Sequence, residues 1–244
     1  RKIIRTVGDP QERFNEDALR MLRAIRFKAR FGFSVHEAVL DAIKESAGTI
    51  NYVSRERILS ELNGILSSPF PEEIRAVFET GLSGHIFPPH VAVVPRLDRL
   101  KPLPEKLPLR WAALLWEIDV TEEEDLHLFC TSMKMGNVLK KDILAILFLL
   151  RGKLPKTGYG LRRTISETGI ANFLDALALA ERTGAFNADF TAIRQLLQDI
   201  TTQQQCTRLT DLAVGGSDLL KAGFPAGRAL GDLLSALFIC VLQK

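Results

Sequence analysis

The chain has 244 residues, of which 46% are hydrophobic and 25% are charged, and its formal net charge is +3. This length allows one large or two modest domains, and the hydrophobic content is sufficient for a buried core. The longest apolar stretch, residues 143–150, is flanked by Lys140, Lys141 and Arg151 and is too short to span a membrane, and no secretory signal is visible.

Helical periodicity dominates the sequence and predicts an all-α fold. Prolines, glycines and serines interrupt the pattern at residues 67–69, 87–108 and 153–158, which are expected to be connections. We expect helices near residues 16–31, 35–47, 55–66, 71–80, 106–117, 122–133, 138–151, 172–183, 188–204 and 226–242.

The first predicted helix begins with the pattern E-D-x-x-R. Asn15 is a suitable N-cap, which would place Glu16 and Asp17 in the first turn. Asp17 and Arg20 would then be neighbours on one face, because residues i and i+3 lie one turn apart. Arginines continue along that side, at positions 23, 26 and 30. The opposite side is expected to be buried and contains Ala18, Met21, Leu22, Ile25 and Ala29.

Two interpretations of this pattern are open from the residues alone. Acidic side chains in a first turn complement the helix dipole, and pairs such as Glu16 with Arg20 are common exposed ion pairs. Alternatively, a carboxylate and a rigid guanidinium one turn apart provide an acceptor and a donor for the edge of a nucleotide base.

Positive charge is concentrated at the N-terminal end. Residues 1–34 contain nine Lys or Arg residues and only four Asp or Glu residues, a balance that suits triphosphate and RNA backbone. No pattern of aromatic and basic residues for stacking single strands is apparent. Other candidate RNA contacts are Lys140, Lys141, Arg162, Arg163 and Arg228, although dibasic pairs are more often solvated surface.

Histidine and cysteine spacings do not predict a metal site within the chain. The four histidines are not spaced with carboxylates as metal ligands would be. Cys130, Cys206 and Cys240 form no C-x-x-C pair and are expected to be buried thiols of a reducing cytoplasm.

Three blocks of sequence carry a resemblance to a known family. The first runs from Val7-Gly8-Asp9-Pro10 through the E-D-x-x-R pattern to Phe31-Gly32-Phe33. The second is Val53-Ser54-Arg55-Glu56-Arg57-Ile58-x-x-Glu61-Leu62. The third is Gly216-x-Asp218-Leu219-Leu220 with the spaced glycines at 223, 227 and 231. Together they resemble class II tRNA nucleotidyltransferases, the CCA-adding enzymes, which are related to bacterial poly(A) polymerases.

The resemblance implies that Asp17 and Arg20 select the incoming nucleotide. Cytosine and adenine both present an exocyclic amine beside a ring nitrogen that accepts, whereas uracil and guanine present a carbonyl beside a ring N–H. A carboxylate can accept from the amine while a guanidinium donates to the ring nitrogen. With uracil or guanine, the carboxylate and the guanidinium would both be left unpaired. The pair would therefore reject these two bases as well as select cytosine and adenine.

The remaining expectations also follow from the resemblance. Glu16, Arg23, Arg26, Arg57 and Glu61 would support the nucleotide site. The fold would be an elongated, multi-helix assembly with a neck (residues 1–70), a body (71–152) and a tRNA-binding tail (153–244). Substrates would be CTP and ATP, the RNA partner would be tRNA, and the protein would be cytoplasmic.

The catalytic carboxylates of the family are not found in this sequence. The family carries a D-x-D pair beside a Gly-Ser loop in an N-terminal head. No D-x-D pair is present here, and Gly216-Ser217, in the third block, is not followed by one. Nucleotidyl transfer needs metal-bound carboxylates. We therefore expect the chain to be inactive alone, with Mg²⁺ and the catalytic residues in a head of the same polypeptide.

Other functions remain compatible with the sequence. A bacterial poly(A) polymerase, an A-adding enzyme and a CC-adding enzyme would share the E-D-x-x-R pattern. A different class of function is a non-catalytic helical RNA-binding module. In a further alternative the chain is a helical scaffold, and the pattern is only an ion-pair face.

Overall fold

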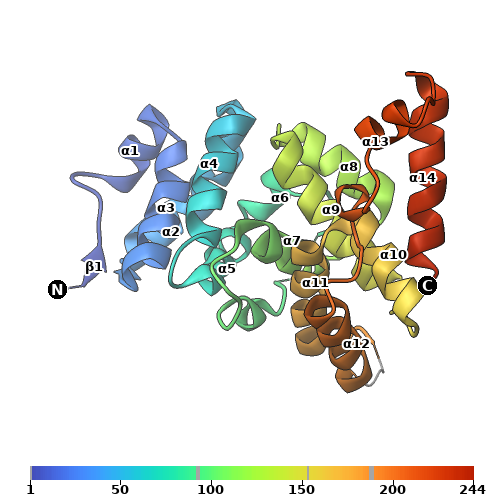
Figure 1. Cartoon of the computed structure of the whole chain (residues 1–244). Coiled ribbons are helices and arrows are strands. Elements are labelled where there is room, and N and C mark those ends of the chain that lie inside the picture. The colour runs from blue at the N-terminus through green and yellow to red at the C-terminus, as the bar shows by residue number, and fades with distance from the viewer. Residues whose placement is uncertain (1, 92–93, 153, 187–189) are drawn as a thin grey trace. The chain divides into compact units, whose positions relative to one another are not determined.

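The computed structural model describes residues 2–91, 94–152, 154–186 and 190–244. Within these residues it contains fourteen α-helices, and the only strands are two of two residues each, so the predicted all-α fold is confirmed (Figure 1). No helix among the described residues is both long and apolar enough to cross a membrane. The chain forms two compact units, Arg1–Arg151 and Gly152–Lys244, which are described separately below. The predicted three-part division, with its boundaries after residues 70 and 152, stays a prediction.

The first unit contains most of the secondary structure. Its elements are β1 (Ile3–Ile4), α1 (Pro10–Glu16), α2 (Leu19–Phe31), β2 (Ser34–Val35), α3 (Glu37–Ser46), η1 (Ala47–Tyr52), α4 (Arg55–Leu66), η2 (Pro71–Ile74), α5 (Arg75–Glu79), α6 (Ser83–Ile86), η3 (Leu97–Leu100), α7 (Leu107–Glu117), α8 (Glu123–Ser132) and α9 (Asn137–Arg151). The predicted helix 55–66 matches α4, whereas the predicted helix 71–80 consists of η2 followed by α5.

The predicted start of the first helix, near residue 16, is wrong. A separate helix, α1, precedes it, because the Asp9 side chain accepts a hydrogen bond from the N–H of Glu12 and Pro10 occupies the first turn. Asn15 lies inside α1 and is not an N-cap. Asp17 has an extended backbone that ends α1, and α2 begins at Leu19. Asp17 therefore lies at a junction between two helices and not within a first turn.

The buried face of α2 packs against α4, and these two helices lie side by side in Figure 1. Met21, Leu22, Ile25 and Ala29 are each fully buried, as the apolar spacing predicted. On α4 the buried positions include Ile58, Leu62, Ile65 and Leu66. Burying side chains of this size contributes about 1.5–3 kcal/mol each, which fixes the two helices against one another.

The C-terminus of α2 depends on Gly32. Gly32 has φ of +63° and its N–H bonds the carbonyl of Lys28, which is a left-handed C-cap. A Cβ built on Gly32 would lie 2.9 Å from the ring of Phe70. The chain then returns as β2, which pairs in parallel with β1 through Ile3 with Ser34 and Ile4 with Val35. Strands of two residues are too short to produce a detectable alternation in the sequence.

The proline-rich stretch after α6 is a connection, as expected, but it is anchored. Leu97 and Leu100 of η3 are fully buried. Arg110 of α7 is also buried and donates to the carbonyls of Leu66, Ser68 and Leu103 at 2.6, 2.8 and 3.2 Å. This arginine therefore ties the end of α4 and the connection to α7.

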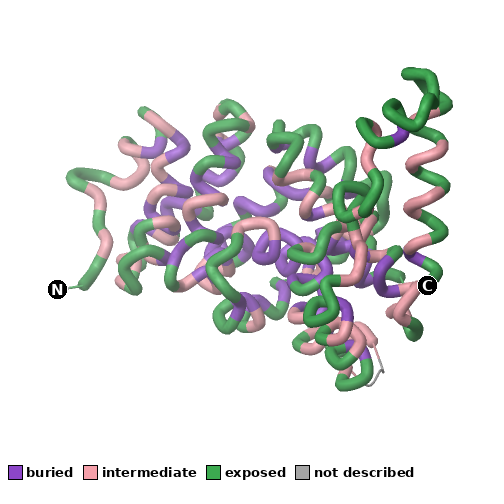
Figure 2. Tube along the Cα trace, in the orientation of Figure 1, coloured by how far each residue is buried: buried purple, intermediate pink, exposed green. Residues whose placement is uncertain are grey.

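The second unit consists of α10 (Gly158–Thr168), α11 (Ile170–Thr183), α12 (Phe190–Thr202), η4 (Leu209–Asp211), α13 (Gly216–Lys221) and α14 (Arg228–Leu242). The predicted helix 188–204 corresponds to α12, and its positions 188 and 189 lie outside the described residues. Helix α10 was not predicted, and most of α14 is half-buried or exposed (Figure 2).

Two side-chain expectations are corrected by burial. Arg162 is buried and donates to the carbonyl of Leu242 at 3.0 and 2.7 Å and to the side chain of Gln205 at 2.7 Å. It therefore joins α10 to the end of α14, and the prediction that it contacts RNA does not fit this position. Of the cysteines, only Cys130 is buried, and its burial raises the thiol pKa to about 11; Cys240 is exposed.

Candidate functional site

The Asp17 carboxylate is held by groups from three directions. Its Oδ1 accepts a 3.1 Å hydrogen bond from the N–H of Leu19, which opens α2. Its Oδ2 accepts 3.0 Å from the guanidinium of Arg57 on α4, and the guanidinium of Arg23 lies 3.7 Å away. The side chain is 23% exposed. Asp17 is thus fixed at the edge of the α2–α4 interface, with part of its surface open.

These partners keep Asp17 ionised. Partial burial acts to raise the pKa of Asp17, but the bond from Leu19 N–H and the positive charges of Arg57 and Arg23 outweigh it, so the pKa lies below its ordinary value. At neutral pH this side chain can only accept hydrogen bonds.

A second cluster holds Arg20. The guanidinium of Arg20 donates to the carboxylate of Glu16 and, at 3.1 Å, to the carbonyl of Arg13. Arg13 in turn donates to Glu16 at 2.9 Å and to the carbonyl of Val7 at 2.7 Å. The bonds from Arg20 and Arg13 lower the pKa of Glu16. The ionised carboxylate of Glu16 therefore accepts a hydrogen bond from Arg20 and orients its guanidinium.

Glu61 forms the buried side of the site. Its side chain is only 9% exposed, and it accepts from Nε of Arg26 at 2.6 Å and from Nε of Arg23 at 3.4 Å. Arg23 thus lies between two carboxylates, those of Asp17 and Glu61. The pattern R-x-x-x-E on α4 places Arg57 and Glu61 one turn apart, so both face α2.

The Asp17 carboxylate and the Arg20 guanidinium are not paired with each other in the described part of the chain. Each is held by its own partners, Asp17 by Leu19, Arg57 and Arg23, and Arg20 by Glu16 and Arg13. An acceptor and a donor positioned by separate partners can bind a third group that has the complementary pattern. The site is therefore equipped to recognise a planar hydrogen-bonding edge.

The predicted site residues on α2 and α4 come together, and one further residue joins them. Arg13 was not identified from the sequence, although its spacing of three residues from Glu16 is an ion-pair spacing once α1 is recognised. The missed signal was Asp9-Pro10, an N-cap followed by proline.

The candidate RNA contacts belong to elements other than those that form this cluster. In the first unit, Lys141 is exposed, while Lys140 donates to the hydroxyl of Thr131 at 3.0 Å and lies 3.1 Å from a ring nitrogen of His127. In the second unit, Arg163 is exposed and pairs with Glu167 at 3.1 Å, and Arg228 is exposed at the first position of α14. These four remain candidates for contact with phosphate.

The described residues do not contain a metal-binding donor set. No group of three His, Cys, Asp or Glu side chains among them is placed to hold an ion.

Comparison with protein families gives two matches. The family described as "tRNA nucleotidyltransferase domain 2 putative" matches residues 105–244. The family described as "Probable RNA and SrmB- binding site of polymerase A" matches residues 32–93.

Comparison with individual proteins gives similar results. The CCA-adding enzyme of Pediococcus pentosaceus is 31% identical over 99% of the chain, and that of Geobacillus kaustophilus is 30% identical over all of it. The chain spans about 60% of the length of these curated relatives. A crystal structure of the Bacillus stearothermophilus CCA-adding enzyme with CTP covers the whole chain at a TM-score of 0.71 and 28% identity, and the chain covers 61% of it. The Thermotoga maritima CCA-adding enzyme with tRNA, at 17% identity and a TM-score of 0.57, shows the fold alone.

Proposed function

The chain belongs to the tRNA nucleotidyltransferase family, and on this premise we propose that it is the nucleotide-selecting and tRNA-binding portion of an enzyme that adds CCA to tRNA 3′ ends. The observation that carries the proposal is the separate anchoring of Asp17 and Arg20. The likeness to CCA-adding enzymes along the whole chain supports it.

The geometry suggests how the bases of CTP and ATP are selected. Asp17 accepts a hydrogen bond from the exocyclic amine, and Arg20 donates to the adjacent ring nitrogen. Arg57 and Glu16 position these two groups, while Glu61 holds Arg23 and Arg26 on α2. UTP is rejected because its carbonyl would face the carboxylate of Asp17, and an unpaired buried group costs about 1–3 kcal/mol.

The other parts of the proposal concern groups outside this chain. We propose that the full polypeptide carries a catalytic head that supplies the carboxylates and binds Mg²⁺, which would stabilise the transferring phosphate. Lys140, Lys141, Arg163 and Arg228 are proposed to contact the tRNA backbone. We place the protein in the cytoplasm, where tRNA maturation would require it.

One observation favours a second candidate. The family that matches residues 32–93 is described by reference to polymerase A, so a poly(A) polymerase that selects only ATP is the alternative. Both enzymes would use the same acceptor and donor, because cytosine and adenine present the same pattern of amine and ring nitrogen.

The test uses the polypeptide that includes the proposed head, with Mg²⁺ and tRNA that lacks its CCA end. Labelled CTP, ATP or both are supplied. Incorporation of C, C and then A supports the proposal, whereas a long A tail supports the alternative. Arg20→Lys should lower incorporation of both nucleotides by about tenfold, because the guanidinium fork is lost. Unchanged incorporation by this variant would contradict the base-reading role of Arg20.

A further inference from the structure

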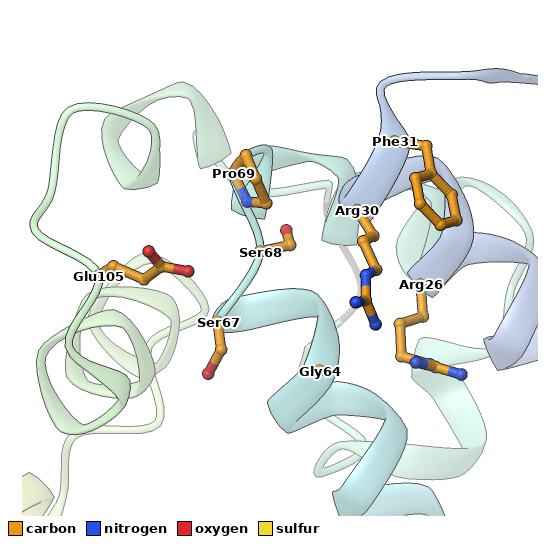
Figure 3. A pocket seen from close by; sticks show the side chains of 8 residues that line it. All are labelled: Arg26, Arg30, Phe31, Gly64, Ser67, Ser68, Pro69 and Glu105. Atoms are coloured by element: carbon orange, nitrogen blue, oxygen red, sulfur yellow. The ribbon is translucent and has the colours of Figure 1, made fainter. Parts of the chain in front are cut away.

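A pocket of about 450 Å³ lies between the C-terminal halves of α2 and α4, within the first unit. Figure 3 shows Arg26 and Arg30 on the α2 side and Glu105 on the other side of the turn at residues 67–69. From its charge and its aromatic wall, we propose that this pocket binds an unpaired nucleotide of RNA. Its phosphate would lie on Arg30 and its base on the ring of Phe31. The inference rests on the proposed RNA-binding function and adds a second nucleotide site to it.

Arg30 is the group in the pocket that is free to bind an anion. It is exposed, and among the described residues it forms no hydrogen bond or ion pair; its guanidinium lies 5.7 Å from the ring centre of Phe31. A guanidinium binds phosphate oxygens through two parallel N–H donors. Arg30 can therefore bind a phosphate without breaking an existing ion pair.

Arg26 provides a second positive charge in a fixed position. Its Nε is bound to Glu61, and its terminal nitrogens have no hydrogen-bond partner within the described ranges. The side chain lies across Gly64, where a Cβ would be 2.5 Å from Cδ of Arg26. Gly64 thus allows this arginine to pass close to α4 on its way into the pocket.

The opposite wall of the pocket, at the C-terminus of α4, repels an anion less than a helix C-terminus usually does. A helix C-terminus normally repels anions because its last carbonyls carry partial negative charge. Here Arg110 binds the carbonyls of Leu66 and Ser68, which reduces that repulsion. Ser67 is exposed and offers a hydroxyl to the pocket. Glu105 is the only carboxylate among the lining residues.

Aromatic rings continue from the pocket along α2. The rings of Phe27 and Phe31 are stacked with centres 6.0 Å apart, and Phe33 lies 5.5 Å from Phe31. Phe31 is 51% exposed. Exposed rings beside arginines are typical of sites where bases of single strands stack. The sequence did not reveal this arrangement, because the turn at Gly32 is needed to bring Phe33 back beside Phe31.

The test measures binding of a short fluorescein-labelled single-stranded RNA to the complete 244-residue chain by fluorescence anisotropy at several salt concentrations. Arg30→Gln should weaken binding by about 3- to 10-fold and reduce the slope of log affinity against log salt by about 0.7, the loss of one phosphate contact. Phe31→Leu should weaken binding by about fivefold or more without changing that slope. Ser67→Glu should also weaken binding, and Glu105→Gln should strengthen it.

The matched control is Arg75→Gln. It removes an arginine of the first unit whose side chain is 41% exposed and is paired with Asp98 at 2.8 Å, outside the pocket. This variant should bind within about twofold of the unsubstituted chain, because a distant exposed charge is screened. Equal losses for Arg30→Gln and Arg75→Gln would overturn the proposal.

Three further outcomes separate this inference from the proposed function. In a parallel titration with CTP, a loss of affinity confined to CTP would assign the phosphate to a free nucleotide and overturn the RNA assignment. If the unsubstituted chain bound no RNA even at low salt, the pocket and the proposed tRNA-binding role would both be overturned. If the chain binds RNA but substitutions at Arg30, Phe31 and Ser67 do not change the affinity, the pocket is not the RNA site, and the proposed tRNA-binding role is unaffected.

Discussion

The carboxylate of Asp17, at the junction of α1 and α2, accepts a 3.0 Å hydrogen bond from the guanidinium of Arg57 on α4. The two residues are forty positions apart, so α4 has to pack against α2 before the acceptor is in place. When a second residue already orients a binding group, that group loses less conformational entropy when a ligand binds. Arg57 is therefore a positioning residue for Asp17.

Replacement of Asp17 by asparagine should relax nucleotide choice. The N–H of Leu19 fixes Oδ1 as the acceptor, so the new amide nitrogen would occupy the place of Oδ2. In Asp17→Asn this donor would face the amine of cytosine but could bond the carbonyl of uracil. We expect the preference for CTP over UTP to fall by about 10-fold to 100-fold, equivalent to about 1–3 kcal/mol.

The measurement is kcat/KM for CTP and UTP on tRNA lacking CCA, in the polypeptide that includes the proposed head. Asp41→Asn is the control, because it changes a carboxylate in an exposed pair with Lys44. An Asp17→Asn variant that stays folded and keeps the original preference would contradict the role of Asp17.

Replacement of Arg57 should affect nucleotide choice more than stability. The Arg57 side chain is 50% exposed, and ion pairs at such positions contribute less than about 1 kcal/mol to folding. Arg57→Ala should therefore leave the melting temperature almost unchanged but reduce the CTP preference by about tenfold, because Oδ2 of Asp17 loses its main partner. Arg57→Lys should restore part of the preference.

Thermal unfolding and kcat/KM for CTP and UTP would be measured together for these variants, with Lys44→Ala as the control for loss of an exposed positive charge. Equal behaviour of Arg57→Ala and Lys44→Ala in the kinetic measurement would show that Arg57 does not position Asp17.

Gly32→Ala should destabilise the first unit. The residue has φ of +63°, and an added Cβ would lie 2.9 Å from the Phe70 ring. Strain of the left-handed backbone and the steric clash together should lower the free energy of unfolding by about 1–3 kcal/mol. Urea unfolding at neutral pH provides the measurement.

The control for Gly32→Ala is Gly84→Ala in α6, where no atom lies within 4 Å of the added Cβ. That change should be neutral or stabilising by up to about 1 kcal/mol, since alanine favours helix. If the two variants unfolded at the same urea concentration, the conformation at Gly32 would not be needed.

Stability should depend on pH through Asp17. Its folded-state pKa is lowered, so its contribution is complete above the unfolded pKa of about 3.9 and is lost as the pH falls through the lowered folded value. Asp17→Asn should thus cost stability at pH near 7 and cost less in acid. Urea unfolding across this range would show a smaller pH dependence for the variant; parallel curves for the two proteins would contradict the ionised role of Asp17.

The sequence was most informative where one local pattern controls the structure. The apolar face of α2 and the bounds of α4 follow from helical spacing alone. The junction at Asp17 was missed because the helix of α2 was extended back to residue 16, and the capping signal at Asp9 and Pro10 was not used as the start of a separate helix. Glu16 and Arg20 do contact one another, because their spacing of four residues bridges the junction.

Contacts between segments far apart in the chain could not be predicted from the sequence. Neither Asp17 with Arg57 nor Arg23 with Glu61 could be located before α2 and α4 were packed. Arg162 shows the opposite error: the basic pair 162–163 suggests a surface, but the carbonyl of Leu242 binds and buries one of its two members. Charge alone does not distinguish a ligand contact from a structural bond.

Arg26 contacts Glu61, which also holds Arg23 beside Asp17, and Arg26 lines the pocket between α2 and α4 as well. Under the two proposals, a ligand in the pocket and a nucleotide beside Asp17 would act on the same set of ion pairs, so their binding would be thermodynamically linked, and such linkage is reciprocal. The factor by which RNA in the pocket changes the affinity for CTP must equal the factor by which CTP changes the affinity for RNA. Through this arginine, the proposed base-reading site would also respond to an RNA strand in the proposed pocket.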